Sequence, residues 1–528
     1  MNARSSLWLI LAACLLTATL QIVLSTRQCL WADEIFSLAT ATGHSLEHSA
    51  ADADPGQGDF VEAKGATKAS VLQSYISHQT PRESPRRVIR AVLRSDTSPP
   101  LYYLCLYLWT SAFGTSDVVL RLLSVCFSVA CVPFVAGLAR RSSGPAAILP
   151  ACLLFAISPL ALYYGTEVRM YSLLLLCVVA NAWSGMVLQG RGAAFGYFLL
   201  WVCSSAAGFL THYFFLFPWA ATLLFLLLFP GRVKRQWLVA GAFLTALAIA
   251  PWYVPVLSAP PHWRITQGWL HLRPQSFHRT RAIRTDFLQY FSSSCYGLWG
   301  YQRWSSLAAT AIFALILASV LWRQRWKVFQ GGQVLLWFWF LAACAAPSAM
   351  DIMLRTYAAD APRYALAALP AACLLAGYWI SFFPPLSRLL ILLIIAALWM
   401  PPTLTIYRQR ARNKQPLQAI GHNLNETVGA SDLVLVHSIP SGVIGVARYC
   451  HPNLAIASWV GQLGTRRVPA SLDVISSGRK RIFFVKVHEV GEPAPEEGWL
   501  QAHSAPSREK RFELGKVTEF RPREDVTF

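Results

Sequence analysis

The chain has 528 residues, of which 55% are hydrophobic and only 14% are charged, and its formal net charge is +20. This composition excludes an ordinary soluble protein, whose surface needs more charge, and it indicates a polytopic membrane protein. A basic excess can indicate a nucleic-acid partner, but it is also typical of the cytoplasmic loops of membrane proteins, so the distribution of the charges must decide.

Apolar stretches long enough to cross a bilayer as helices, roughly 17 to 25 residues each, recur along the first 406 residues. We predict eleven spans, near 7–25, 119–138, 145–163, 170–188, 194–211, 213–229, 236–252, 305–322, 333–349, 364–381 and 386–406. Because eleven is odd, the two termini are expected on opposite sides of the membrane.

Lys and Arg in the short connections indicate the orientation. With a cytoplasmic N-terminus, the cytoplasmic pieces contain no Asp or Glu, and their basic residues are Arg4, Arg140, Arg141, Arg191, Arg232, Lys234, Arg235, Arg323, Arg325, Lys327 and Arg388. All 26 acidic residues then fall on the outer side. The charge pattern therefore predicts a membrane topology and no nucleic-acid partner.

The predicted first outer loop, residues 26–118, contains three kinds of segment. It opens with Trp31-Ala32-Asp33-Glu34 and continues through a polar stretch, 44–70, without an evident core. A basic helical segment follows at 84–94, and then Asp96-Thr97-Ser98-Pro99-Pro100. The apolar residues 101–113 are too few to cross, so we expect a helix lying in the outer interface.

From residue 407 the apolar runs become shorter and charges become frequent. Residues 433–437 and 482–487 are typical of buried strands, with a helix near 442–449 between them. The sequence thus predicts two parts. Residues 1–406 form an all-α polytopic membrane module of about eleven transmembrane helices, and residues 407–528 form a small α/β domain outside the membrane.

Polar residues cluster at the outer ends of the predicted spans. The clusters are Asp33 with Glu34, Asp96 before the two prolines, Tyr164, Glu167 and Arg169 in a short hairpin, His212 at another connection, and Arg363 with Tyr364. Each has an ordinary explanation, since Arg at a span end commonly reaches the interface and Tyr commonly forms interfacial belts. Their gathering on one face of an apolar protein favours a site instead.

Transfer of a group from a lipid phosphate requires this set of side chains. A carboxylate accepts the proton of an incoming hydroxyl or amine, while guanidinium groups stabilise the charge on the departing phosphate. The membrane spans would bury an isoprenoid tail.

The same motifs resemble a known family. Trp31-Ala32-Asp33-Glu34, Asp96-Thr97-Ser98-Pro99-Pro100-Leu101-Tyr102-Tyr103, Phe113-Gly114, Leu120-Arg121-Leu122, Glu167-Val168-Arg169-Met170-Tyr171 and Pro362-Arg363-Tyr364 are similar to bacterial C-type glycosyltransferases. The nearest groups are the dolichyl-phosphate-mannose protein mannosyltransferases and the lipid A aminoarabinose transferases. The resemblance runs over about residues 1 to 400, in the same order.

This resemblance implies inverting transfer of a sugar from a polyprenyl-phosphate donor on the periplasmic face of a bacterial inner membrane. It implies that Asp33 is the general base and that Glu34, beside it, positions a substrate. Arg363 would bind the lipid phosphate, with Arg169 as a second contact. Some relatives with diphosphate donors use a divalent ion. Whether Asp33 and Asp96 hold such an ion here is an open question. The chain departs from the family in a long insert before residue 84 and in Ser98, where many relatives have His or Gln. The nature of the acceptor pocket is therefore undetermined.

Two other functions compete with this hypothesis. A transporter or flippase for a lipid-linked or anionic solute would use Asp33, Glu167 and Arg363 as a pathway, but it would favour charges at mid-bilayer depth. A sensory or assembly protein would use the outer domain. For an enzyme, the acceptor could be a glycolipid, a glycan or a protein.

Overall fold

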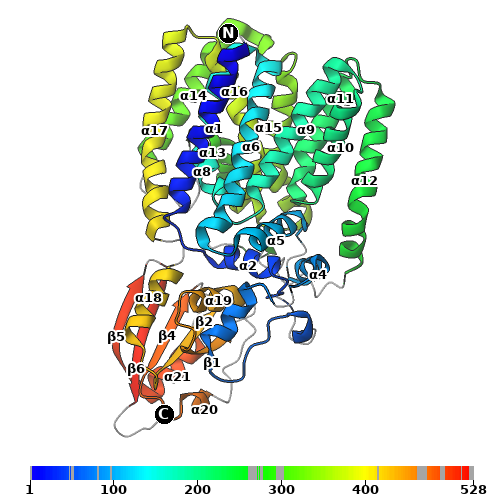
Figure 1. Ribbon diagram of the computed structural model, residues 1–528. Helices are drawn as coiled ribbons and strands as arrows, with labels where there is room; N and C mark the ends of the chain where they lie inside the picture. The colour runs from blue at the N-terminus through cyan, green and yellow to red at the C-terminus, as the bar shows by residue number, and fades with distance from the viewer. Residues whose placement is uncertain are drawn as a thin grey trace.

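The computed structural model describes residues 3–46, 48, 53–79, 82–95, 98–259, 270–271, 273, 277–292, 303–412, 416–460, 472–487, 494–512 and 514–522. A bundle of long helices lies above a smaller domain built around a sheet, and the termini lie at opposite ends of the molecule (Figure 1). The predicted fold class, a polytopic helical membrane protein with a small C-terminal α/β part, is confirmed.

Every predicted span is helical. The bundle contains α1 (Ala3–Ser25), α6 (Asp117–Ser143), η4 (Pro145–Ala147), α7 (Ile148–Ile157), α8 (Pro159–Gly165), α9 (Tyr171–Arg191), α10 (Phe195–Phe209), α11 (Leu216–Leu228), α12 (Arg235–Ser258), α14 (Arg303–Gln324), η8 (Arg325–Phe329), α15 (Gln333–Leu354), α16 (Leu369–Ser381) and α17 (Pro385–Arg412). Within the described ranges, eight helices are long and apolar enough to cross a membrane. The bent pair α7 and α8 and the shorter apolar helices α10 and α11 account for the remaining predicted spans.

The break between α7 and α8 follows from the sequence. Pro159 occupies the first turn of α8. Because proline has no N–H to continue the helical hydrogen bonds of α7, the pair bends by 56° at this point.

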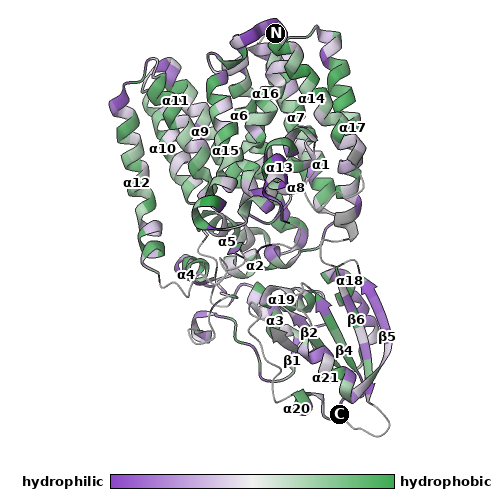
Figure 2. Ribbon diagram, turned by 180° about the vertical axis from the view of Figure 1, so that it is seen from behind, coloured by the Kyte–Doolittle hydropathy of each residue, from purple (hydrophilic) through white to green (hydrophobic). Residues whose placement is uncertain are grey.

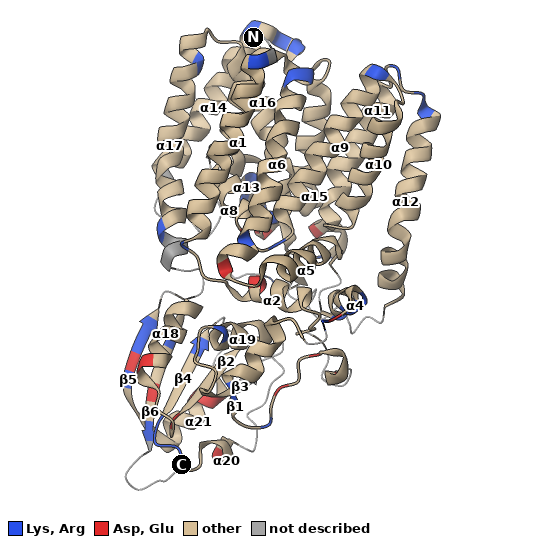
Figure 3. Ribbon diagram, viewed as in Figure 1, with Lys and Arg blue, Asp and Glu red and all other residues tan. Residues whose placement is uncertain are grey.

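The helices of the bundle consist mostly of hydrophobic residues along their length (Figure 2). Large side chains such as Phe243, Leu315 and Leu393 are exposed on its outer helices, as expected for a surface that faces lipid. At the end of the bundle near the N-terminus, the described charged residues are Lys and Arg, whereas Asp and Glu lie in the half nearer the C-terminal domain (Figure 3).

Residues 26–118, the predicted first outer loop, lie partly between the bundle and the C-terminal sheet and partly within that sheet (Figure 1). Its elements are α2 (Ala32–Ala41), η2 (Pro55–Gln57), β1 (Thr67–Lys68), α3 (Ala69–Gln73), η3 (Ser74–Ile76), α4 (Pro85–Ser95) and α5 (Leu101–Phe113). The predicted helices at 84–94 and 101–113 are confirmed. The expectation that the polar stretch 44–70 lacks a core is wrong, because Leu46 and Phe60 are buried and β1 joins the sheet.

The C-terminal part contains α18 (Leu417–Thr427), β2 (Leu433–Ser438), α19 (Pro440–Arg448), β3 (Ala455–Val460), α20 (Leu472–Ser476), β4 (Ile482–Val487), α21 (Pro495–His503), β5 (Ser504–Phe512) and β6 (Gly515–Pro522). Among the described residues the strand order is β1-β3-β2-β4-β6-β5. Strands β3, β2 and β4 are parallel, and the other pairings are antiparallel. Both predicted strands and the helix between them are confirmed.

Alternation along the strands separates the two faces of this sheet. Leu433 and Leu435 pack in a cluster with residues of α20 and α21. Val434 and Val436 point the other way and belong to the same apolar cluster as α18, α19, α2 and the helix bundle. The core of the bundle therefore continues into the C-terminal domain through α2 and α19.

Candidate active site

Helix α2 carries both acidic residues in its first turn. Consecutive positions on a helix point about 100° apart, so the two carboxylates face different surroundings. The Asp33 side chain is 27% exposed, whereas the Glu34 side chain is 1% exposed. The two acids therefore serve different purposes.

Glu34 lies in a buried ionic network with Arg121 of α6. The two Nη atoms of Arg121 contact the two carboxylate oxygens of Glu34, with 2.7 Å between Nη2 and Oε2. Arg121 also donates to the carbonyl oxygens of Thr166, at 3.1 Å, and Cys29, at 2.8 Å. The Val168 N–H donates to Glu34 Oε1 at 2.9 Å.

This network joins four parts of the chain: the segment between α1 and α2, α2 itself, α6 and the hairpin between α8 and α9. Glu34 is also the third residue of α2, and its Oε2 accepts from the N–H of Trp31, which precedes the helix, at 3.3 Å. Glu34 thus fixes the start of α2 and the direction of the neighbouring Asp33. Arg121 was not singled out as a site residue, although an Arg inside an otherwise apolar span is a signal for one.

Asp33 faces Arg363, which is 330 positions away along the chain and lies in η10 (Pro362–Ala368). The Arg363 Nη1 is 3.6 Å from Asp33 Oδ2, and the two side chains are 25% and 27% exposed. This ion pair is therefore accessible from outside the protein. A carboxylate and a guanidinium remain within reach of a ligand there.

Hydrogen bonds from α15 and α13 (Arg279–Ser292) hold the segment that carries Arg363. Asp351, near the end of α15, accepts hydrogen bonds from Thr356 Oγ1 at 2.8 Å and from the N–H groups of Ala358 and Ala359 at 2.6 and 3.0 Å. These residues lead into η9 (Ala358–Asp360). The hydroxyl of Tyr290, on α13, donates to the carbonyl of Ala365.

Aromatic rings surround Arg363. Its guanidinium carbon lies 5.5 Å from the centre of the Tyr364 ring, a cation–π geometry. The Tyr364 ring stacks on Phe214, of η5 (Tyr213–Phe215), at 4.9 Å, and it lies 6.2 Å from His212. On the other side of His212, Tyr171 is 6.3 Å away. Tyr164 in turn lies 5.1 Å from Tyr171.

Arg169 supplies a second cation to this cluster. Its Nη1 donates to the hydroxyl oxygen of Ser37, at 3.3 Å, and to that of Tyr103, at 3.4 Å. Ser37 Oγ in turn donates to the carbonyl of Asp33, one helical turn earlier. Arg169 therefore lies against the same helix as the acid pair and against α5.

His212 is neutral in this setting. Its Nδ1 accepts a hydrogen bond from the N–H of Phe214 at 3.1 Å, which leaves Nε2 to carry the proton. Burial, and then the positive charges of Arg169 and Arg363, lower the pKa of His212 to about 3. At neutral pH this side chain can donate or stack but does not add charge.

Contacts therefore link most of the predicted site residues in one cluster: Asp33, Tyr164, Arg169, His212, Arg363 and Tyr364. Glu167 is buried nearby, and its carbonyl accepts from Ser124 Oγ at 2.6 Å. Asp96 lies outside the described residues. Tyr103, which the sequence offered only as part of a motif, and Ser37, which it did not single out, also belong to the cluster.

A metal site was left open between Asp33 and Asp96. Among the described residues, no group of three or more His, Cys, Asp or Glu side chains is arranged to hold a metal ion. The carboxylate next to Asp33 in the sequence, that of Glu34, is engaged by Arg121. The cluster contains two guanidinium groups, those of Arg169 and Arg363, which can bind an anion.

Comparison with known proteins found a matching family model and similar structures. Residues 97–254 match the family model described as dolichyl-phosphate-mannose-protein mannosyltransferase. The structure of ArnT from Cupriavidus metallidurans bound to undecaprenyl phosphate is similar to this chain, with a TM-score of 0.59, 12% identity and 98% of each chain covered. The apo structure of that ArnT gives a TM-score of 0.55 and 12% identity, over 91% of this chain and 95% of that one. No curated protein matches the chain in sequence.

Proposed function

From the C-type glycosyltransferase fold, which these similarities show, we propose that the protein transfers a sugar from a polyprenyl-phosphate donor to an acceptor, with inversion at the anomeric carbon. The observation that carries the proposal is the accessible Asp33 carboxylate 3.6 Å from the Arg363 guanidinium. The undecaprenyl phosphate in the similar ArnT structure supports a lipid-phosphate ligand.

In the proposed reaction, an acceptor hydroxyl oxygen or amine nitrogen attacks the anomeric carbon. The bond between that carbon and the phosphate oxygen breaks, and polyprenyl phosphate leaves with the bonding electrons. Asp33 takes the proton of the acceptor. A single displacement of this kind inverts the configuration.

The two arginines stabilise the leaving phosphate, which gains one negative charge in this step. Arg363 presents a planar pair of donors to it, and Arg169 adds positive charge from the hairpin side. Tyr364, His212 and Tyr164 form aromatic walls for the sugar or for the first isoprene units, with Glu167 behind them. Glu34 positions Asp33 through the Arg121 network, and Asp96 is proposed to bind a substrate.

The charge distribution supports a cytoplasmic N-terminus and a periplasmic site in a bacterial inner membrane. Among the described residues, the charged side chains at the end of the bundle opposite the site are Lys and Arg (Figure 3). The donor would reach the site from the outer leaflet, and the acceptor would be a glycolipid, a glycan or a protein.

The test uses the full-length protein in lipid nanodiscs with synthetic undecaprenyl-phosphate sugars and a panel of glycolipid, glycan and Ser/Thr peptide acceptors. Released undecaprenyl phosphate and glycosylated product are measured by mass spectrometry. Asp33→Asn is expected to lower transfer by about 10²- to 10⁴-fold, the usual contribution of a general base. Asp473→Asn, which changes an exposed acid on α20 in the same way, serves as the matched control. Wild-type transfer rates in Asp33→Asn would exclude the assignment.

A further inference from the structure

The C-terminal domain contacts the chain immediately before the acid pair. Tyr449, just after α19, accepts a hydrogen bond at its hydroxyl from the N–H of Leu30, at 2.9 Å. The same hydroxyl donates to Asp117 Oδ2, at the start of α6, at 2.6 Å. One phenol therefore joins the acid-bearing segment, the bundle and the C-terminal domain.

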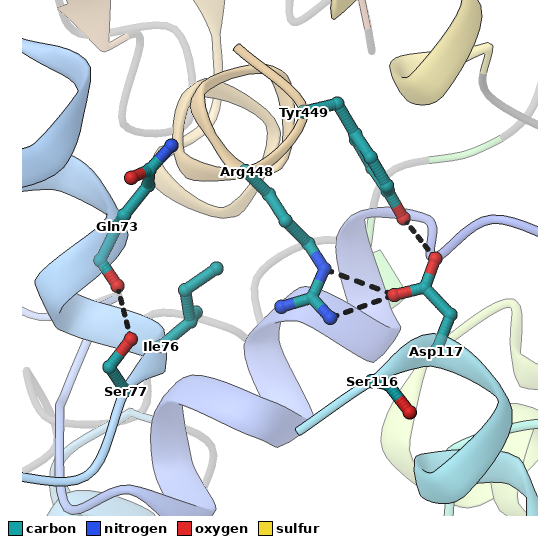
Figure 4. A pocket seen from close by; sticks show the side chains of 7 residues that line it. All are labelled: Gln73, Ile76, Ser77, Ser116, Asp117, Arg448 and Tyr449. Carbon is teal, nitrogen blue, oxygen red and sulfur yellow. Dashed lines mark hydrogen bonds and ion pairs between the residues drawn. The ribbon is translucent and has the colours of Figure 1, made fainter. Parts of the chain in front are cut away.

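Arg448 completes this junction. Its Nε and Nη2 donate to Asp117 Oδ1 at 3.1 and 2.8 Å, and its Nη2 also donates to the carbonyl of Thr115 at 2.6 Å. Figure 4 shows Arg448 and Tyr449 converging on Asp117. These three residues line a hollow of about 460 Å³. Burial, and then the negative charge of Asp117, raise the pKa of Tyr449 well above its usual value, so the phenol keeps the proton that it donates.

Three consecutive residues before α2 are consequently held by three different elements. The Cys29 carbonyl accepts from Arg121 of α6, the Leu30 N–H donates to Tyr449, and the Trp31 N–H donates to Glu34 of α2. Leu30 is fully buried, so its N–H would lack a partner without the phenol. The direction of the first turn of α2 depends on these bonds.

Helix α19 also packs directly against α2. A Cβ added at Gly445 would lie 3.3 Å from Ile35 Cγ1 and 2.6 Å from Leu417 Cδ1, so the two helices approach closely at this glycine. Gln73 of α3 donates to the carbonyls of Ala447 and Cys450, which satisfies acceptors at the end of α19. The first outer loop and the C-terminal domain thus interlock around α2.

We propose that the C-terminal domain positions the catalytic carboxylate: Tyr449 and Arg448, anchored on Asp117, hold residues 29–31 and so fix the first turn of α2 that presents Asp33 to the substrates. Tyr449 and Arg448 are positioning residues and do not touch the substrate. The inference rests on the proposed function only where it concerns transfer, because the protection of the amides of residues 29–35 from hydrogen exchange can be measured without activity.

The test compares Tyr449→Phe with Tyr407→Phe in the full-length protein. Tyr407 is the matched control because its hydroxyl also bonds to the backbone of the N-terminal segment, but within α1, where it donates to the carbonyl of Leu20 at 2.5 Å. Amide hydrogen exchange of residues 29–35 is followed by mass spectrometry, and transfer kinetics are measured as in the assay above. Tyr449→Phe is expected to accelerate exchange in 29–35 and to lower kcat about 10-fold or more, with the donor KM within about 2-fold. Tyr407→Phe should change neither quantity.

A second pair of variants keeps the test independent of a single substitution. Arg448→Ala should accelerate exchange in 29–35 and lower kcat, as Tyr449→Phe does. Arg448→Lys keeps a cation beside Asp117, so it should retain more of the exchange protection and more of the kcat than Arg448→Ala. Unchanged exchange in 29–35 for both Tyr449→Phe and Arg448→Ala would overturn the inference, as would accelerated exchange with normal kcat. A wild-type protein that transfers no sugar would refute the proposed function alone, because the exchange measurement would still report the support of α2.

Discussion

The Arg121–Glu34 network gives the most direct prediction of stability. Both side chains are 1% exposed, and Arg121 donates to two carbonyl oxygens as well as to the carboxylate. Arg121→Ala would leave a buried carboxylate without its counter-charge and two buried carbonyls without a donor. Breaking a buried pair by removing one partner costs about 3 to 5 kcal/mol, so we expect a large loss of stability.

Thermal unfolding of the purified protein, followed by tryptophan fluorescence, measures this effect. Arg121→Ala should melt several degrees below the wild type. The double variant Glu34→Gln/Arg121→Met should recover much of that loss, because no charge stays buried and the single amide oxygen still accepts from one of the two N–H groups, that of Trp31 or that of Val168. Transfer should stay low in the double variant, since the Cys29 carbonyl loses its donor and the segment before Asp33 is less well held.

An exposed pair provides the control. Arg511 contacts Glu509 at 2.6 Å on β5, with the Arg511 side chain 83% exposed, and Arg511→Ala should leave the melting temperature unchanged. If Arg121→Ala melted like the wild type, the argument that Glu34 depends on a buried counter-charge would be refuted. If the double variant melted no higher than Arg121→Ala, uncompensated charge would not be the cause of the loss.

Three further predictions concern donor binding and pH. Arg363→Ala should raise the donor KM roughly 10- to 100-fold, the value of a charge-assisted hydrogen bond, with little change in melting because the side chain is partly exposed; donor titration checks this, and an unchanged KM would contradict it. Asp351→Asn keeps the size of the side chain but weakens its three hydrogen bonds to the segment before Arg363, so the donor KM should rise by a smaller factor in the same titration. Burial lowers the pKa of His44 to about 4, so between about pH 6.5 and 4 the unfolded chain binds a proton that the folded chain does not, and stability should fall by up to about 3 kcal/mol as the pH falls through that window. Between pH 7 and pH 5 the melting temperature should fall less for His44→Gln than for the wild type. Equal falls in melting temperature would contradict the lowered pKa of His44.

The span pattern and the charge partition were predictable because both follow from local composition. The bilayer fixes the length of an apolar helix, and Lys and Arg in short connections mark one side. The same local rules found β2, β4 and α19, whose apolar residues are consecutive. They failed for the stretch 44–70, where Leu46 and Phe60 are isolated apolar residues that are nevertheless buried, Phe60 against Tyr75. Strand β1 in the same stretch pairs with β3, nearly 400 residues away.

The candidate site could be predicted in its residue types but not in its pairings. Asp33, Arg169, Arg363 and Tyr364 were recognisable as polar residues at the outer ends of spans. The sequence could not show that Asp33 meets Arg363 while Glu34 meets Arg121, because each pair joins distant parts of the chain. It also gave no sign of the junction at Tyr449, an ordinary residue at the end of a short helix in a domain without a recognisable motif.

The division of roles between the two adjacent acids follows from helix geometry and from what surrounds α2. A helix turns about 100° per residue, so a helix that points one acid toward the buried Arg121 must point its neighbour elsewhere. The network on Glu34, Cys29 and Leu30 selects which acid is buried, and it leaves Asp33 directed at the accessible cation of Arg363. Exchanging the two residues, Asp33→Glu with Glu34→Asp, would keep the composition but shorten the buried side chain by one methylene. Arg121 would then lose contact with the start of α2, which is why the order of the two acids matters as well as their presence.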